Sequence, residues 1–313
     1  MRLRLCARGR LSGIDFEKTM KTYNLCFWVG ESYAYTYIPW SSVAVARVHY
    51  SGEYEVYSES CEEGLLGRLE WALGIREDLS EFYELASRDP LLGGFARAFT
   101  GWRLRSCDLW WGLLVAVCQQ NASFKQGWRM IHELVRVYSK RVDLESTQLL
   151  RPPSPREVLE EPEKLRRAGL GYRADTVLRV AEALEAGRLR GEDLARLDPA
   201  EAERALRRIR GVGAYTARLA LVLSARRYEL PPLDRWLRRV TSVVYGVSER
   251  EAEKYWSEKW GRWSGLASVA ATIALDAEVL SRALERVKRG AVLPDPRVKP
   301  SPLNMAWFCE ELL

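Results

Sequence analysis

The chain has 313 residues, of which 47% are hydrophobic and 29% are charged, and its formal net charge is +6. This length and composition are typical of a globular protein with two or three domains. The sequence has no apolar run of the roughly 18 residues that a membrane-spanning helix needs, and its first residues lack a secretory signal. We therefore expect a cytoplasmic protein without a membrane partner.

The six cysteines stand at scattered positions and form no C-x-x-C pair. Neither a zinc site nor an iron–sulfur site is indicated by such spacing, so the sequence predicts no metal site. Free cysteine is among the most buried residue types, and we expect most of the six to be small buried side chains. They are Cys6, Cys26, Cys61, Cys107, Cys118 and Cys309.

The first 85 residues predict a small antiparallel sheet preceded by a short helix at about Asp15–Met20. Short β-rich runs are separated by Gly and Ser, which is typical of strands joined by turns. An aromatic cluster in this region is expected to pack on the sheet, although a surface that stacks on nucleic acid remains an alternative. The β-rich runs are Leu25–Val29, Ser32–Pro39, Val43–Tyr50 and Tyr54–Ser58, and the aromatic residues are Tyr33, Tyr35, Tyr37 and Trp40.

From about residue 86 the pattern is helical to the C-terminus, so the predicted fold class is α+β. Trp110–Val117 is apolar on nearly all sides, which predicts a buried helix. This helix runs into Gln119, Gln120 and Asn121, and polar amides in such a place either face a functional surface or cap a turn. A second helix is predicted over Trp256–Asp276, and the proline-containing tail Val292–Leu313 is expected to fold back onto the body.

Residues 202–226 predict two helices joined by a tight glycine turn, Gly211-Val212-Gly213. The second helix begins with unpaired N–H groups, which together with the helix dipole form a site for a phosphate. Residues 201–240 contain ten Arg against three Glu and one Asp, an excess as large as that of the whole chain. The basic charge is therefore expected to lie around this turn, as in proteins that bind nucleic acid.

Asp234 follows two prolines and precedes a helical pattern, so it stands where an N-cap residue would stand. A G-V-G hairpin followed about twenty residues later by such an aspartate resembles the helix–hairpin–helix DNA glycosylase superfamily, in particular its AlkA-type alkylpurine and 8-oxoguanine branches. The resemblance implies a sheet-bearing domain over residues 1–85 and a two-part helical domain over residues 86–313. It places the catalytic Asp loop at residues 231–235.

The same resemblance implies roles for individual residues. Asp234 would be the catalytic carboxylate, and Tyr215 would stack on a base that has been rotated out of duplex DNA. Trp260 and Trp263 are candidates for the walls of the base pocket, with burial in the core as the alternative. The expected DNA contacts are Gly211, Gly213, Ala214, Arg207, Arg210, Gln120 and Asn121, and Asn121 would fill the space that the rotated nucleotide leaves.

One position decides the expected mechanism. Family members that also cleave the DNA strand have a lysine two residues after the second hairpin glycine, where this chain has Tyr215. A phenol cannot form a Schiff base, so we expect hydrolysis by water without lyase activity. No cofactor is expected to be required, and a monovalent cation is a candidate at the contact between hairpin and phosphate.

The expected function is therefore excision of a damaged purine in base excision repair, and the branch of the family stays open. Tyr215 favours an alkylated, 3-methyladenine-like base, whereas Asn121 and the string Gly169-Leu170-Gly171-Tyr172-Arg173-Ala174 favour 8-oxoguanine. A helix–hairpin–helix protein that only binds DNA is a further alternative. The expected partner is double-stranded DNA with a damaged base, bound by a monomer that associates with the nucleoid through that DNA.

Overall fold

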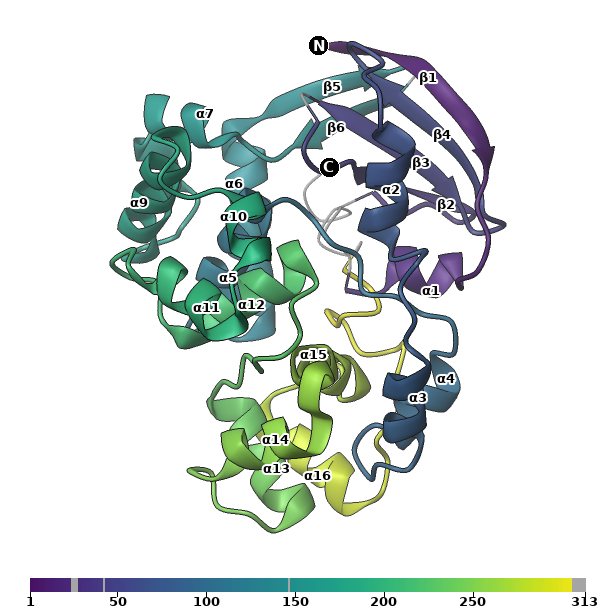
Figure 1. Ribbon diagram of the computed structural model, residues 1–313, viewed down its shortest axis with the longest axis vertical. Helices are drawn as coiled ribbons and strands as arrows, with labels where there is room; N and C mark the ends of the chain where they lie inside the picture. The colour runs from purple at the N-terminus through teal and green to yellow at the C-terminus, as the bar shows by residue number, and fades with distance from the viewer. Residues whose placement is uncertain (24–27, 42, 146, 306–313) are drawn as a thin grey trace.

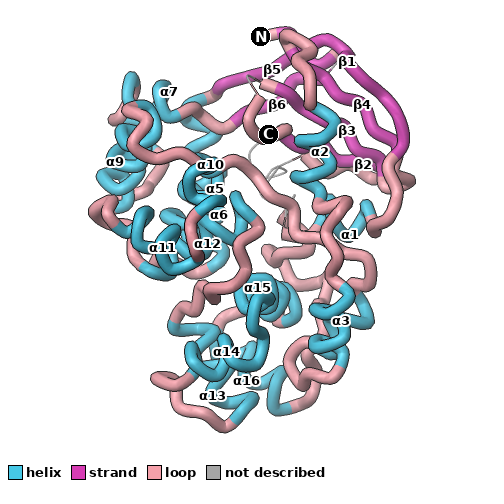
Figure 2. The backbone as a smooth tube through the Cα atoms, viewed as in Figure 1, coloured by secondary structure: helices cyan, strands magenta, loops and turns pink. Residues whose placement is uncertain are grey.

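The computed structural model describes residues 1–23, 28–41, 43–145 and 147–305. A sheet lies at one end of the molecule, and helices make up the rest (Figure 1, Figure 2). The predicted α+β class is thereby confirmed. Among the described helices, none is both long and apolar enough to cross a membrane.

The sheet has six strands in the order β2-β3-β4-β1-β5-β6. Every pair of neighbours is antiparallel except β1 and β5, which run parallel. The strands are β1 (Arg2–Arg10), β2 (Tyr33–Tyr37), β3 (Ala44–His49), β4 (Glu53–Ser58), β5 (Lys140–Leu144) and β6 (Thr147–Arg151).

Two predictions are wrong because of strands β5 and β6. The chain after residue 86 was predicted to be helical but contains these two strands, and the sheet was predicted to be antiparallel but pairs β5 with β1 in parallel. The charged residues of β5 obscure a short alternating pattern in which Val142 and Leu144 are buried. These two side chains pack with Leu3 of β1 in one apolar cluster. The hairpin therefore completes the sheet from the middle of the chain. The β-rich run predicted at 25–29 falls largely outside the described residues.

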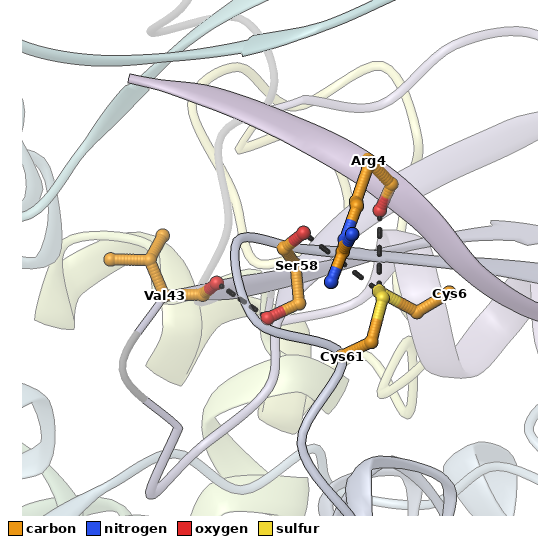
Figure 3. Close-up of a disulfide and its surroundings, with 5 residues drawn as sticks. All are labelled: Arg4, Cys6, Val43, Ser58 and Cys61. Atoms are coloured by element: carbon orange, nitrogen blue, oxygen red, sulfur yellow. Dashed lines mark hydrogen bonds between the residues drawn. A yellow bond between two sulfur atoms is a disulfide. The ribbon is translucent and has the colours of Figure 1, made fainter.

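A disulfide joins Cys6 and Cys61, whose Cα atoms are 5.2 Å apart (Figure 3). The expectation of buried thiols is wrong for these two cysteines and is confirmed for Cys107 and Cys118, which are free and buried. The bond follows from strand pairing, because β1 lies beside β4 and its register is irregular between Leu5 and Ala7. The sequence spacing gave no sign of this contact. Cys26 and Cys309 lie outside the described residues.

Helices α1 and α2 cover one face of the sheet, and the other described helices form two groups (Figure 1). One group contains α5 to α12, and the second contains α3, α4 and α13 to α16. The helices are α1 (Phe16–Lys21), α2 (Leu65–Leu73), α3 (Ser80–Ser87), α4 (Gly93–Ala98), α5 (Leu109–Gln119), α6 (Phe124–Tyr138), α7 (Pro155–Glu160), α8 (Glu163–Arg167), α9 (Arg173–Glu185), α10 (Gly191–Arg196), α11 (Pro199–Arg207), α12 (Ala214–Ala225), α13 (Arg235–Tyr245), α14 (Ala252–Trp260), α15 (Ser264–Ala274) and α16 (Leu280–Lys288).

Helix α5 is buried along its whole length, as its uniformly apolar sequence predicts. The single helix expected over Trp256–Asp276 is instead divided into α14, the 3₁₀ turn η1 (Gly261–Trp263) and α15. Gly261 causes the break, because its φ of 50° lies in the left-handed region. Gly265 in α15 permits the close packing that was expected, since a Cβ atom there would lie 2.6 Å from Val222.

The described part of the tail, residues 292–305, folds back onto the body as predicted. The N–H of Tyr23 donates to the carbonyl oxygen of Pro302 at 2.7 Å, so the tail contacts the segment that follows α1. Met305 is 1% exposed. Of the final apolar turn predicted at 305–313, only Met305 is described, and residues 306–313 lie outside the described residues.

Candidate active site

A cavity of about 570 Å³ lies where segments distant in the sequence meet. Its walls come from the segment after α1, the junction of α5 and α6, helix α12, the loop before α13 and its first turn, the end of α15, the start of α16, and the tail. Four aromatic side chains line it, together with one aspartate that faces the interior. The aromatic residues are Tyr23, Phe124, Tyr215 and Trp236, and the aspartate is Asp234.

Asp234 is the N-cap residue of α13, as the sequence predicts. Its Oδ1 accepts a hydrogen bond from the N–H of Leu237 at 2.8 Å, which satisfies one of the free donors of the first helical turn. The side chain is exposed to the cavity, but the surrounding walls exclude much of the water around it. This desolvation raises the pKa of the Asp234 carboxyl, while the backbone hydrogen bonds from Leu237 and Trp236 oppose the rise.

Tyr215 and Tyr23 both lie near Asp234. Burial raises the pKa of the Tyr215 hydroxyl well above its ordinary value, and the negative charge of Asp234 raises it further. The pKa of Tyr23 is raised for the same two reasons. Tyr23 also packs edge-on against Trp128, with ring centroids 6.1 Å apart. The cavity therefore places neutral phenol rings beside a carboxylate.

The glycine turn has the geometry of a tight hairpin between α11 and α12. Gly211 has a φ of 99°, and a Cβ atom there would lie 2.1 Å from the Thr176 hydroxyl oxygen, so only glycine fits. Gly213 is the N-cap of α12, and none of the described side chains caps this end. The first N–H groups of α12, beginning at Ala214, are thus available to an anion.

The arginines of this stretch divide into two groups. Arg210 is exposed, and Arg207 is half exposed while it pairs with Glu203 at 3.0 Å. Five other arginines, which lie farther along the chain, form ion pairs at 3.3 Å or less. The excess positive charge of residues 201–240 is therefore not all free around the glycine turn, as the sequence had predicted it to be. The carboxylate partners of these arginines neutralise part of the positive charge. These arginines are Arg218, Arg226, Arg227, Arg238 and Arg239.

The polar segment after α5 lies against the hairpin and against the turn before α9. Gln120 donates from Nε2 to the carbonyl oxygen of Gly211 at 3.4 Å. Arg173 donates from Nη2 to the carbonyl oxygens of Gln120 and Asn121, at 2.5 and 3.2 Å. Asn121 is exposed with a φ of 49°, and its Nδ2 is 3.5 Å from the hydroxyl of Tyr172, which is 59% exposed. Three turns therefore form one polar surface beside the cavity.

Trp260 and Trp263 do not line this cavity, which corrects their assignment as pocket walls. Both pack against Phe82 of α3, each with a ring-centroid distance of 6.3 Å. Trp263 donates from Nε1 to Glu81 at 2.9 Å, and the two side chains are 1% and 7% exposed. Both rings therefore belong to the core, the alternative that the sequence left open.

The sequence did not point to several residues that line the cavity. Trp236 stands only two positions after Asp234, and its Nε1 donates to the carbonyl oxygen of Glu278 at 2.9 Å. Its place in the same loop could have suggested it. Tyr23 and Lys299 come from segments far apart in the chain, and no local pattern marks them.

Among the residues that the structure describes, no group of three or more His, Cys, Asp or Glu side chains is arranged to hold a metal ion.

No family model matches the chain. The DNA-3-methyladenine glycosylase of Bacillus subtilis (strain 168) is 27% identical over 168 residues, which are 53% of this chain and 55% of that protein. The chain thus matches about half the length of this curated relative.

Three solved structures share the fold over most of the chain. The structure of MBOgg1 in complex with a low affinity DNA ligand has a TM-score of 0.69 at 19% identity and covers 91% of this chain and 99% of its own. The 8-oxoguanine glycosylase/lyase of Clostridium acetobutylicum, bound to double-stranded DNA, has a TM-score of 0.66 at 20% identity, with 80% and 87% covered. The 3-methyladenine DNA glycosylase of Archaeoglobus fulgidus has a TM-score of 0.69 at 20% identity, with 85% and 97% covered. The resemblance to helix–hairpin–helix DNA glycosylases is thereby confirmed.

Proposed function

We propose that the protein is a DNA glycosylase that releases a damaged purine from duplex DNA by hydrolysis. The observation that carries this proposal is the meeting of Asp234 and Tyr215 in one aromatic cavity, at the foot of a helix whose first N–H groups are uncapped. The similarity to glycosylases that act on 3-methyladenine or 8-oxoguanine supports it. A protein that only binds DNA would not need a carboxylate inside such a cavity.

The chemistry begins with extrusion of the damaged nucleotide, because a base inside the stack cannot be reached. The hairpin amides after Gly213 and the exposed Arg210 hold the backbone phosphates, which positions the protein without reading sequence. Asn121 lies on the adjoining polar surface, where it fills the vacancy in the duplex. The cavity receives the base.

Asp234 then stabilises the positive charge that develops on the deoxyribose as the N-glycosidic bond breaks. A carboxylate serves this role at oxocarbenium-like transition states, and its effect is stronger where water is excluded. The hydrogen bond from Leu237 uses Oδ1, and we infer that Oδ2 faces the sugar or orients the attacking water. Water adds to the sugar carbon, and the base leaves with the bonding electrons.

The reaction stops at the abasic site, without cleavage of the strand. The lysine of the bifunctional glycosylases is replaced by Tyr215, and a phenol cannot condense with the sugar aldehyde. The raised pKa of Tyr215 keeps its hydroxyl protonated. Borohydride added during the reaction should therefore trap no covalent complex.

An alkylated purine of the 3-methyladenine class is the first candidate substrate. Such bases are electron-poor and have labile glycosidic bonds, and stacking of a cationic base on Tyr215 is worth about 0.5–2 kcal/mol. A specific observation supports 8-oxoguanine as the second candidate: Lys125, Arg282 and Lys299 line the cavity together with the carboxylates Asp234 and Glu278. The charge of the lining therefore does not select a cationic base over a neutral one.

The test is a panel of duplexes that each carry one damaged base: 3-methyladenine, 1-methyladenine, hypoxanthine, uracil or 8-oxoguanine. The wild-type protein should release one or more of these bases, and the strand should break only after hot alkali. Strand cleavage without alkali would contradict the hydrolytic mechanism, and release of no base would contradict the glycosylase proposal.

A further inference from the structure

Arg218 of α12 binds three separate elements at once. Its Nε donates to Glu203 Oε2 of α11 at 2.8 Å, and its Nη1 donates to Glu253 Oε1 of α14 at 2.8 Å. The same Nη1 donates to the carbonyl oxygen of Pro231 at 3.3 Å, in the loop that leads to Asp234. The Arg218 side chain is only 13% exposed, so these contacts lie largely away from water.

The two carboxylates extend this arrangement in both directions. Glu203 also accepts from Nη1 of Arg207 at 3.0 Å, and Glu253 also accepts from Nη2 of Arg238 at 2.5 Å. Five charged side chains of alternating sign thus connect α11 with α13. One end of this ion chain lies at the surface beside the glycine turn, and the other lies in the first turns of the helix that Asp234 caps.

Arg218, at the centre of the ion chain, is the arginine that pairs with both carboxylates, so its loss removes the most hydrogen bonds. Glu203 is 8% exposed at its side chain, and a buried carboxylate is tolerated only while it is paired. Burial acts to raise the pKa of Glu253, but the hydrogen bonds from Arg218 and Arg238 lower it below its ordinary value. The planar guanidinium can serve acceptors in several directions, which a single ammonium group cannot do in the same way.

The loop before Asp234 packs its side chains into the core, but its backbone has few groups that can hydrogen-bond to a neighbour. Pro231 and Pro232 have no N–H group, so the carbonyl oxygens are the groups by which a neighbour can hold this segment. The carbonyl oxygen of Pro231 accepts both from Arg218 and, at 2.9 Å, from the N–H of Leu233, which forms the turn that delivers Asp234.

We propose that Arg218 is a positioning residue for the chemical step: it fixes the loop of Asp234 at a set place relative to the hairpin that grips DNA. The inference rests on the proposed glycosylase function and goes beyond it, because Arg218 is largely buried and does not line the cavity. Its removal moves the carboxylate relative to a sugar that the hairpin still holds. The rate of base release falls, whereas the affinity for DNA does not.

The test compares Arg218→Lys and Arg218→Met with the matched variants Arg227→Lys and Arg227→Met. Arg227 follows the same helix, and its side chain is 16% exposed. It pairs with Glu229 at 3.0 Å and donates to the carbonyl oxygen of Leu197 at 2.9 Å, away from the Asp234 loop. Single-turnover base release, affinity for a duplex with an abasic-site analogue, the pH–rate profile and the melting temperature are measured for each variant.

We expect both Arg218 variants to lower the single-turnover rate by about 10- to 100-fold, as misplacement of a catalytic group by about 1 Å does. DNA affinity should stay at the wild-type value, and the Arg227 variants should keep both quantities. Arg218→Met removes one cationic partner from each of two carboxylates, and Glu203 and Glu253 then keep only Arg207 and Arg238. Arg218→Lys decides the matter if the methionine variant does not fold. The acid limb of the pH–rate profile should move in the lysine variant, which a purely structural role would not cause.

The outcomes separate the two proposals. If the wild-type protein releases a damaged base and Arg218→Lys releases it equally fast, the positioning role is overturned while the glycosylase function stands. Equal losses of rate and affinity would also overturn it, since they would make Arg218 a residue of DNA binding. A wild-type protein that releases no base overturns the function, and the inference with it.

Discussion

Asp234 and Asp276 both have a pKa that burial raises, but of the two only Asp234 lines the cavity that we propose as the active site. Asp276 follows α15 and is wholly enclosed; its Oδ2 accepts from Arg286 at 2.7 Å and from the N–H of Asp295 at 2.8 Å. Asp234 accepts on Oδ1 from the N–H of Leu237 and opens into a cavity. The comparison shows that a raised pKa alone does not identify a catalytic carboxylate, because the carboxylate must also be accessible to a substrate.

The largest effect should come from exchanging each carboxylate for an amide. Asp234→Asn keeps the acceptor oxygen that caps α13 but loses the negative charge, so base release should fall by at least about 100-fold. Asp276→Asn should leave the single-turnover rate near the wild-type value. Both rates are measured on the preferred damaged base, with DNA affinity as the control for folding. A catalytic loss in Asp276→Asn of the same size would remove the distinction.

The next effect concerns the aromatic wall, which Asp234 has and Asp276 lacks. Tyr215→Ala removes the ring that we propose to stack on the extruded base, and such stacking is worth about 0.5–2 kcal/mol, so kcat/KM should fall by about 2- to 30-fold. Tyr215→Phe keeps the ring and should retain most of the activity. Equal losses in the two variants would show that the hydroxyl, and not the ring, serves the reaction.

Asp276, the enclosed carboxylate, should instead affect how the free energy of unfolding depends on pH. The pKa of Asp276 is raised from 3.8 to about 6 in the folded protein, mainly because burial disfavours its charged form. The folded state therefore binds more protons than the unfolded state between these two pH values, and this group's contribution to the free energy of unfolding falls as the pH rises through that window. Asp276→Asn should flatten the pH dependence there, as measured by denaturant unfolding. An unchanged slope would contradict the assigned shift.

The smallest effect should be on DNA affinity, from two arginines outside the cavity. Arg210 is exposed, whereas Arg227 is paired with Glu229. Arg210→Ala should reduce the slope of log K against log salt concentration by about one, the value that corresponds to one lost phosphate contact. Arg227→Met should leave that slope unchanged, because Arg227 is held by Glu229 inside the protein. Affinity titrations at several salt concentrations check this, and identical slopes for all three proteins would exclude Arg210 from the DNA contact.

The features that the sequence predicted are those that local chemistry decides. The two glycines of the hairpin, the cap at Asp234 and the buried helix α5 depend on residues a few positions apart, and all are present. The parallel pairing of β5 with β1, the disulfide of Cys6 and the approach of Tyr23 and Lys299 to the cavity depend on contacts between distant segments. No short-range pattern encodes these. Trp260 and Trp263 are pocket candidates by resemblance alone, and their packing against Phe82, from a distant helix, also has no local signal.

The most direct test of the central claim is the position of the sugar in a crystal structure of the protein bound to a duplex with an abasic-site analogue. The account predicts the sugar carbon that carried the base about 3–3.5 Å from an oxygen of Asp234 or from a water that it orients. The adjoining phosphate should accept from the first N–H groups of α12. A complex in which the DNA lies on another face, with Asp234 remote from the sugar, would contradict it.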